Sequence, residues 1–248
     1  MVQPLFFTAL ARQMKPGQVF VLSGDEGKHA ATVKRMRAGE KLQLGDGTGV
    51  RASATVLQNL GSTLEVSIDA IHEEPLPQLQ LTLVQALAKG DRDELAVQAA
   101  TELGAIQIVP WQANRCISKW DGPKLVKGVN RWQTIVSEAA KQSLRVWTPK
   151  VLPAVDTASL AALVPDFDLV LVLDPTASVS LKSLIPNQGR VAVVVGPEGG
   201  IDESELTELE AAGAKRVHLG SGILRTSTAG LAAISAILAF GSAWDEAP

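Results

Sequence analysis

The run Val191-Ala192-Val193-Val194-Val195 is the feature that most restricts how this chain can fold. Its residues are all apolar and mostly β-branched, so the predicted strand is buried on both faces. A parallel sheet with helices on both sides provides such a position. The sequence after residue 79 agrees, because predicted strands alternate there with predicted helices. Strands are expected at 80–87, 106–110, 168–173, 190–196 and 215–219, and helices at 92–103, 124–145, 203–212 and 227–243.

The first 72 residues predict a small all-β unit instead. Its expected strands are short apolar runs at 18–22, 41–44, 52–57 and 64–71, and the glycine-rich segment 45–49 predicts a hairpin turn. A helix is expected at 25–36, with Lys34, Arg35 and Arg37 near its carboxyl end, where positive charge is favourable.

The segment Glu73-Glu74-Pro75-Leu76-Pro77 continues neither a helix nor a central strand, because its prolines lack the amide hydrogen. We therefore expect a β domain at residues 1–72, a linker at 73–78 and an α/β domain at 79–248.

Composition excludes several classes of protein. The 248 residues include a single cysteine, Cys116, so no intrachain disulfide forms, and three scattered histidines do not form a zinc cluster with it. The amino terminus lacks the pattern of a signal peptide, and the longest apolar run, Ala229–Phe240, is too short to cross a bilayer. We expect a reduced, metal-free cytoplasmic protein without a membrane anchor.

Charge is segregated along the chain. The net charge is −3, yet residues 115–150 contain eight basic and two acidic side chains. Four of the five tryptophans (Trp111, Trp120, Trp132, Trp147) lie in or beside this segment. Cationic side chains next to indoles suit an RNA surface. Helical spacing predicts Trp132 in the core and places Arg131, Glu138, Gln142 and Arg145 on the opposite face. This opposite face is the candidate RNA or active-site surface, with a solvated charged face as the alternative.

A glycine-rich turn follows the buried strand, in the order Gly196-Pro197-Glu198-Gly199-Gly200-Ile201-Asp202. Asp202 and Glu205 predict a capping box for the next helix. Open α/β sheets place ligands at the carboxyl ends of their strands, so we interpret this turn as facing a ligand. Neither a phosphate-binding lysine nor the dinucleotide spacing of glycines is present, and an ordinary strand-to-helix connection remains an alternative.

A second loop follows the next predicted strand, with the sequence Leu219-Gly220-Ser221-Gly222-Ile223-Leu224-Arg225-Thr226-Ser227-Thr228-Ala229. Its glycines leave main-chain groups available to hold an adenine, and Thr226 or Ser227 is expected to cap the helix that follows. Arg225 is expected to face an anionic or electron-rich substrate, with a surface salt bridge as the alternative.

Together, GPEGG and the later LG-x-G-x-LRT-x-TA pattern resemble the carboxyl-terminal signature of SPOUT-class RNA methyltransferases. The similarity is to the ribosomal RNA small subunit methyltransferase E family, which methylates N3 of a uridine in 16S ribosomal RNA. It extends over nearly the whole chain, through Lys89, Arg92, residues 101–104, Arg115, residues 131–145 and the short helix at 29–35.

The resemblance implies a PUA-like β-barrel followed by a SPOUT-type α/β domain whose carboxyl-terminal segment forms a trefoil knot. It implies S-adenosylmethionine bound in the knot, a homodimer formed through the knotted domain, and 16S rRNA or the small ribosomal subunit as partner. The expected cofactor-binding residues are Leu173, Gly196, Pro197, Glu198, Gly199, Gly200, Leu219, Gly220, Ile223, Leu224, Thr226, Thr228 and Ala229. The expected RNA-binding residues are His29, Lys34, Arg35, Arg37, Arg115, Arg131, Gln142 and Arg145.

Catalysis is expected to depend on Arg225, assisted by Arg115 or Arg145, which would stabilise negative charge on the uracil oxygens. Many members of the family have a glutamate where this chain has Ser227, so no catalytic carboxylate is expected there. Glu102, Glu138 and Glu198 remain possible bases. Methylation of another RNA base, noncatalytic RNA binding and a nucleotide-dependent oxidoreductase activity are the alternatives.

Overall fold

The computed structural model describes residues 3–241 and 243–244, and the chain divides into two compact units. The first, called here the β unit, contains the chain up to Leu76 together with Ala140–Thr148. The second, the α/β unit, contains Pro77–Ala139 and the chain from Pro149 onward.

The segment 140–148 was expected with the α/β domain and instead groups with the β unit. The reason is a set of main-chain hydrogen bonds. The Gly49 amide donates to the Val146 carbonyl at 3.1 Å, and the Thr148 amide donates to the Gly47 carbonyl at 3.0 Å.

The β unit is a curved five-stranded sheet in the order β1-β3-β4-β5-β2. Its strands are β1 (Leu5–Phe7), β2 (Val19–Leu22), β3 (Lys41–Gly45), β4 (Val50–Asn59) and β5 (Leu64–Glu73). β1 pairs with β3 in parallel, the other pairs are antiparallel, and two register shifts between β4 and β5 add curvature. A 3₁₀ helix occupies Ala11–Gln13.

The short helix of this unit differs from the expected one. α1 (Gly24–Lys28) continues as a π-helix over His29–Val33, and Arg35 then adopts a left-handed conformation with φ of 52°. Ala30, Ala31 and Met36 face the core beside Phe6 and Leu42, so burial determines where the helix lies.

The α/β unit contains a six-stranded, wholly parallel sheet in the order β11-β9-β10-β6-β7-β8. The strands are β6 (Leu79–Ala86), β7 (Gln107–Trp111), β8 (Lys150–Val151), β9 (Leu169–Leu173), β10 (Gly189–Val195) and β11 (Lys215–Val217). Val191–Val195 are all at most 2% exposed, which confirms the predicted strand buried on both faces.

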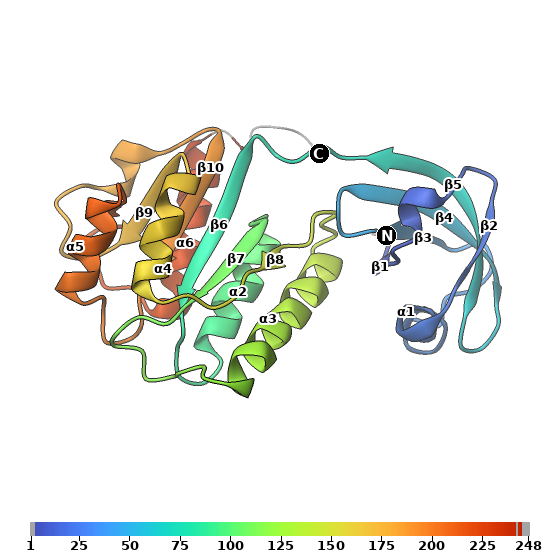
Figure 1. Ribbon diagram of the computed structural model, residues 1–248. Coiled ribbons are helices and arrows are strands. Elements are labelled where there is room, and N and C mark those ends of the chain that lie inside the picture. The colour runs from blue at the N-terminus through green and yellow to red at the C-terminus, as the bar shows by residue number, and fades with distance from the viewer. Residues whose placement is uncertain (1–2, 242, 245–248) are drawn as a thin grey trace. The chain divides into compact units, whose positions relative to one another are not determined.

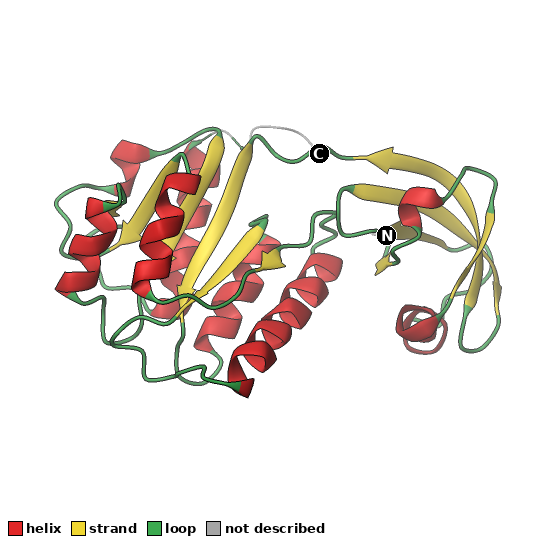
Figure 2. Cartoon of the chain, in the orientation of Figure 1, coloured by secondary structure: helices red, strands yellow, loops and turns green. Residues whose placement is uncertain are grey.

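Helices cover both faces of this sheet, as Figures 1 and 2 show. They are α2 (Arg92–Glu102), α3 (Pro123–Gln142), α4 (Thr157–Leu163), α5 (Glu203–Ala211) and α6 (Thr226–Phe240), with 3₁₀ helices at Val164–Asp166 and Leu181–Leu184. α4 and α5 pack together on one face, and α2 and α6 pack together on the other.

The chain leaves edge strand β11 and returns, through α6, to the central strands β6 and β10. Gly230 permits this packing, because a Cβ there would lie 2.9 Å from Leu83 Cδ1 and 3.2 Å from Val195 Cγ2.

The predicted helix at 124–145 was wrong in its last turn. α3 ends at Gln142, Leu144 takes φ of 57°, and the Arg145 amide donates to the Ala140 carbonyl at 2.8 Å. This is the hydrogen bond of a Schellman motif, with leucine where glycine is usual. Arg145 therefore does not continue the helical face of Arg131 and Glu138.

Candidate active site

The carboxyl ends of three neighbouring strands, β9, β10 and β11, surround the main cavity of the α/β unit, whose volume is about 590 Å³. Leu173, Val195 and Val217 end these strands and line the cavity. Parallel strands place their following loops at one edge of the sheet, which explains how segments distant in sequence meet here. The volume is typical of a pocket for a cofactor-sized ligand.

The two glycine-rich loops both contribute to this cavity. Of the thirteen expected cofactor-binding residues, ten line it: Leu173, Gly196, Pro197, Glu198, Gly200, Leu219, Ile223, Leu224, Thr226 and Ala229. Gly199 and Gly220 belong to the same two loops and Thr228 to the first turn of α6, but none of the three lines the cavity.

The first loop leads into α5 through the expected capping box. The Asp202 carboxylate accepts from the Ser204 amide at 3.1 Å, and the Glu205 carboxylate accepts from the Asp202 amide at 3.1 Å. The predicted start of this helix is thereby confirmed. Gly199 allows a close approach of Arg115, because a Cβ at this glycine would lie 3.3 Å from Arg115 Cβ.

The second loop contains main-chain amides that are free to bind a ligand. In residues 3–241 and 243–244, the amides of Leu219, Ile223 and Leu224 donate no hydrogen bond to the protein. Ile223 is 84% exposed at the cavity. These groups are available to a ligand with hydrogen-bond acceptors and a flat apolar face.

Thr226 does not cap α6, contrary to expectation, and neither does Ser227, because the residue at the N-cap is Arg225. The buried Thr226 hydroxyl instead donates to the Gly196 carbonyl at 2.8 Å and accepts from Gln85 Nε2 at 2.9 Å. This side chain therefore joins the start of α6 to the ends of β10 and β6.

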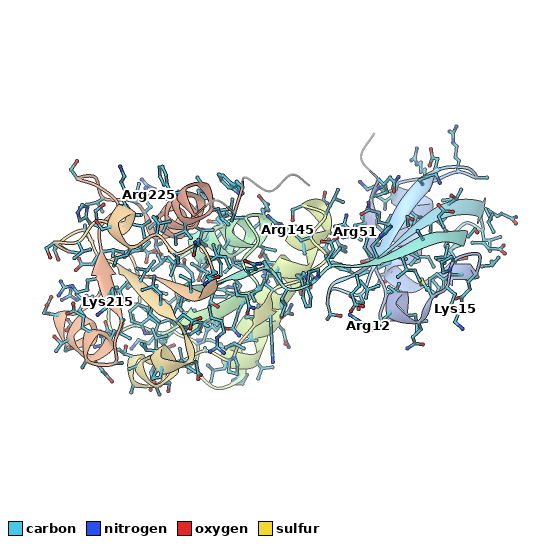
Figure 3. The ribbon with its side chains drawn as sticks, turned by 90° about the horizontal axis from the view of Figure 1, so that it is seen from above. Arg12, Lys15, Arg51, Arg145, Lys215 and Arg225 are labelled. Atoms are coloured by element: carbon cyan, nitrogen blue, oxygen red, sulfur yellow. The ribbon has the colours of Figure 1, made fainter. Side chains whose placement is uncertain are left out.

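Three arginines line the cavity, and two of them are paired. Arg92 Nη1 lies 2.8 Å from Glu198 Oε1, and Arg115 Nη2 lies 2.9 Å from Asp202 Oδ2. Arg225, labelled in Figure 3 where α6 begins, forms no ion pair within the described part of the chain. Its guanidinium is exposed and available to an incoming substrate.

Glu198 is held in its ionised form. Partial burial on its own raises the pKa of this carboxyl, but hydrogen bonds from its own amide, from the Lys89 amide and from Arg92 outweigh burial and lower it. A carboxylate with a lowered pKa is a weak base. Glu102 and Glu138 do not line the cavity.

At the end of β9, only Leu173 was predicted at the cavity, and the loop that follows this strand was missed. Asp174, Pro175 and Thr176 line the cavity, and the Asp174 carboxylate accepts from the Thr176 amide at 2.9 Å and from Arg216 Nε at 2.8 Å. The signal was available, since a third parallel strand end at this edge predicts a third loop. The other cavity residues that were not expected are Arg92, Val195, Ile201, Glu203, Leu206 and Val217. Gly222 also lines the cavity and belongs to the second loop, whose glycines were expected near the ligand.

The expected RNA-binding residues fall in both units. In the β unit, Lys34, Arg35 and Arg37 are exposed, while His29 is half-buried with its ring edge-on to Phe6 at 5.9 Å. Gln142 and Arg145, the latter labelled in Figure 3, group with the same unit. In the α/β unit, Arg115 lines the cavity, and Arg131 is bound to the Glu94 carboxylate by two hydrogen bonds of 3.0 and 2.8 Å.

The tryptophans of the basic segment are mainly structural. Trp111 and Trp132 are at most 1% exposed, Trp120 packs edge-on against Trp132 at 5.1 Å, and Trp147 Nε1 donates to the Glu74 carbonyl at 3.1 Å. The predicted place of Trp132 in the core is confirmed. The interpretation that Trp111 stacks on RNA bases was wrong, because no base can reach it.

Other chemistries find little support in the described residues 3–241 and 243–244. No three histidine, cysteine, aspartate or glutamate side chains gather there in a way that could hold a metal ion. No helix in this part of the chain has the length and apolar character needed to span a membrane. Burial raises the pKa of the Cys116 thiol to about 11, so this cysteine is a poor nucleophile.

Comparison with known proteins identifies both parts of the chain. Residues 74–238 match the model of an RNA methyltransferase domain, and residues 22–59 match that of an RNA methyltransferase PUA domain. The chain is 43% identical over 234 residues to ribosomal RNA small subunit methyltransferase E of Mycobacterium bovis, covering 92% of this chain and 89% of the relative. It is 32% identical over 247 residues to the enzyme of the same name from Bacillus subtilis, covering 95% and 96%.

The fold agrees with these matches. The structure of a ribosomal RNA small subunit methyltransferase E from Neisseria gonorrhoeae bound to S-adenosyl methionine superposes with a TM-score of 0.85 at 31% identity, covering 96% of this chain and 98% of that one. The α/β unit is a SPOUT-type domain, and a PUA-like domain precedes it. The chain therefore belongs to the ribosomal RNA small subunit methyltransferase E family of RNA methyltransferases.

Proposed function

We propose that this protein transfers a methyl group from S-adenosylmethionine to N3 of one uridine in 16S ribosomal RNA. The observation that carries the proposal is the cavity at the ends of β9, β10 and β11, which is bordered by both signature loops. The names of the relatives, ribosomal RNA small subunit methyltransferase E, support the choice of ribosomal RNA.

The residues of the cavity fit this methyl donor. Leu173, Val217, Leu219 and Ile223 offer an apolar wall for an adenine, and the unbonded amides of Ile223 and Leu224 offer donors for its ring nitrogens. The three remaining expected residues, Gly199 and Gly220 in the loops and Thr228 in the first turn of α6, are proposed to shape the segments that hold the cofactor.

The bound cofactor would supply an electrophilic methyl group on a sulfonium centre. The protein's part is to align the uracil with that methyl group and to stabilise the charge that develops as N3 loses its proton. Arg225 is suited to this task, because its guanidinium is exposed at the cavity and has no carboxylate partner among the described residues.

Arg115 is proposed as the second arginine, since it lines the same cavity while paired with Asp202. Arg145 remains a candidate from the sequence alone. Burial lowers the pKa of its guanidinium, although the nearby Glu74 opposes this effect.

Two carboxylates that line the cavity, Asp174 and Glu198, have a lowered pKa and are therefore weak bases. Ser227 occupies the second position of α6, and a hydroxyl needs its own activation to accept a proton. Hydrogen bonds lower the pKa of Glu198. We therefore propose that arginine electrostatics lower the pKa of the bound uracil, so that its N3 proton passes to solvent water before the methyl group is transferred.

RNA binding is proposed for the cationic surface formed by Lys34, Arg35 and Arg37, with His29 beside it. Arg131, Gln142 and Arg145 are proposed as further contacts. Following the family resemblance, we also expect a homodimer formed through the knotted domain, a cytoplasmic location and no metal requirement.

The test is methyl transfer by the purified protein, with S-adenosylmethionine carrying a labelled methyl group and either free 16S rRNA or small ribosomal subunits. Label is expected in one uridine, at N3. The Arg225→Ala variant is expected to bind the cofactor normally but to lose most of its turnover. Full turnover with unchanged cofactor affinity would remove Arg225 from the mechanism.

Isothermal titration separates this function from the noncatalytic alternative. A saturable heat with S-adenosylmethionine supports the enzyme, whereas RNA binding without cofactor binding would favour a noncatalytic RNA-binding protein.

A further inference from the structure

Glu205 is a buried carboxylate that the proposed mechanism does not use. It occupies the third position of α5 and is only 1% exposed. In the part of the chain that the structure describes, no arginine, lysine or histidine forms an ion pair with it. Burying a carboxylate without a cation costs free energy. The hydrogen bonds that offset this cost for Glu205 therefore need an explanation.

Both oxygens of Glu205 accept hydrogen bonds from other segments. Oε2 accepts from the Asp202 amide at 3.1 Å, as any capping box requires. Oε1 accepts from the Asn114 amide at 2.8 Å and from the Thr157 hydroxyl at 2.6 Å. The Thr157 hydroxyl in turn accepts from the buried Trp111 Nε1 at 3.2 Å. Helix capping therefore does not explain the two hydrogen bonds that Oε1 accepts.

The segments joined by Glu205 are the two that hold Arg115. Asn114 immediately precedes Arg115, and Asp202 is the partner of the Arg115 guanidinium at 2.9 Å. Arg115 Nη1 also donates to the Gly199 carbonyl at 3.4 Å. One carboxylate thus fixes the main chain at both ends of the Arg115–Asp202 pair at the cavity.

We propose that Glu205 is a positioning residue for methyl transfer, which sets the place of Arg115 at the cavity by binding the amides of Asn114 and Asp202. The inference rests on the proposed function through the role of Arg115. A general loss of stability in α5 would affect the whole cavity, whereas a positioning role predicts an effect that depends on Arg115.

The test is a double-mutant cycle between Glu205→Gln and Arg115→Ala, with Glu208→Gln as the control. Glu208 lies on the exposed side of the same helix, so its variant makes the same chemical change away from the network. Glutamine at 205 keeps one acceptor oxygen but places an amide NH2, itself a donor, where one of the present donors points.

With saturating RNA and cofactor, Glu205→Gln is expected to lower kcat by about tenfold or more, because small misplacements of a catalytic group are costly. In the Arg115→Ala background the same change is expected to lower kcat by less than about twofold, since coupled sites are not additive. Glu208→Gln is expected to leave kcat unchanged. Equal losses from Glu205→Gln in the two backgrounds would overturn the proposal, as would full activity of the single variant.

Thr157→Val serves if Glu205→Gln does not fold, because it keeps the carboxylate and both of its amide bonds. It is expected to produce a smaller loss of kcat that again disappears in the Arg115→Ala background, and an equal loss in both backgrounds would overturn the proposal.

A crystal structure of the Glu205→Gln protein provides a readout that needs no substrate. Arg115 is expected to leave Asp202, and an unchanged Arg115–Asp202 pair would refute the positioning role even if the wild-type protein methylated no RNA. Absence of methyl transfer by the wild type is a separate result, which would count against the proposed function.

Discussion

At the scale of single residues, Thr226 is the side chain whose role changed most between sequence and structure. It was expected to contact the cofactor and to cap α6, yet its hydroxyl connects Gly196 to Gln85 beneath the cavity. Sequence could not predict this, because Gln85 precedes Thr226 by 141 residues and only the return of α6 to β6 and β10 brings them together.

Replacing Thr226 with valine keeps the shape of the side chain and removes both hydrogen bonds. The buried Gln85 amide then loses one of its two acceptors and the Gly196 carbonyl loses its donor. We expect a loss of about 1–3 kcal/mol in the free energy of unfolding, measured in urea. Cofactor affinity is expected to fall about tenfold in calorimetry, equivalent to about 1.4 kcal/mol.

Thr207→Val is the control for this variant, because Thr207 is exposed on α5 and its hydroxyl bonds only within its own helix. Unchanged cofactor affinity in Thr226→Val would show that the bridge does not shape the cavity.

Asp174 predicts a specific dependence of stability on pH. Burial on its own raises the pKa of this carboxyl, but hydrogen bonds from Thr176 and Arg216 outweigh burial, so the pKa lies below its usual value. A lowered pKa in the folded state means that the ionised form stabilises the fold at neutral pH. This stability is lost as the pH falls through the folded pKa.

The free energy of unfolding of Asp174→Asn is therefore expected to lie below that of the wild type by a constant amount from pH 7 down to about pH 4, near the usual pKa of aspartate. At lower pH the gap is expected to narrow. Urea unfolding at several pH values measures it, and a gap that stays constant to pH 3 would contradict the assignment.

At the scale of elements, the long and strongly patterned segments were predictable. The parallel strands at Leu79–Ala86, Leu169–Leu173 and Gly189–Val195 and the helices α2, α5 and α6 lie within a few residues of their expected positions. Two short strands were missed, β1 with three residues and β8 with two. Such strands form through pairing with distant neighbours and have little periodicity of their own.

α4 is an instructive omission. Asp156 caps it by accepting from the Ser159 amide at 2.9 Å, and a run of good helix formers follows. The capping signal was therefore present in the sequence, although the helix is only seven residues long. The last turn of α3 could not be predicted in the same way, because it depends on a left-handed leucine at position 144.

The capping box of α5 allows helix capping to be separated from the ion pair with Arg115. Asparagine at 202 can still accept from the Ser204 amide, whereas alanine cannot. Asp202→Ala is therefore expected to lower the melting temperature by about 2–4 °C, and Asp202→Asn by less. Both variants are expected to lose turnover, because both remove the charge that holds Arg115. A melting temperature that falls equally in the two variants would show that the charge, and not the cap, stabilises this turn.

At the scale of the whole molecule, a net charge of −3 gave little indication of an RNA partner, because the basic side chains are concentrated in a few segments. Arg35 carries part of this positive charge and also has an unusual backbone conformation. It is exposed in the β unit, and its φ of 52° is unfavourable for any residue with a side chain. Arg35→Gly therefore removes one positive charge and relieves the left-handed strain.

We expect Arg35→Gly to weaken RNA binding and to reduce its dependence on salt, while the free energy of unfolding stays the same or rises slightly. Fluorescence anisotropy at two salt concentrations measures the first effect, and urea unfolding measures the second. Lys182→Ala is the control, because it removes an exposed charge from a 3₁₀ helix outside the proposed RNA surface. Equal losses of affinity in the two variants would contradict a specific surface around Arg35.

The central claim concerns the reaction itself, and mass spectrometry of 16S rRNA nucleosides from cells that lack this gene tests it most directly. Loss of one N3-methyluridine is expected, with recovery on return of the wild-type gene and not of the Arg225→Ala variant. An unchanged set of methylated nucleosides in the deletion strain would contradict the claim.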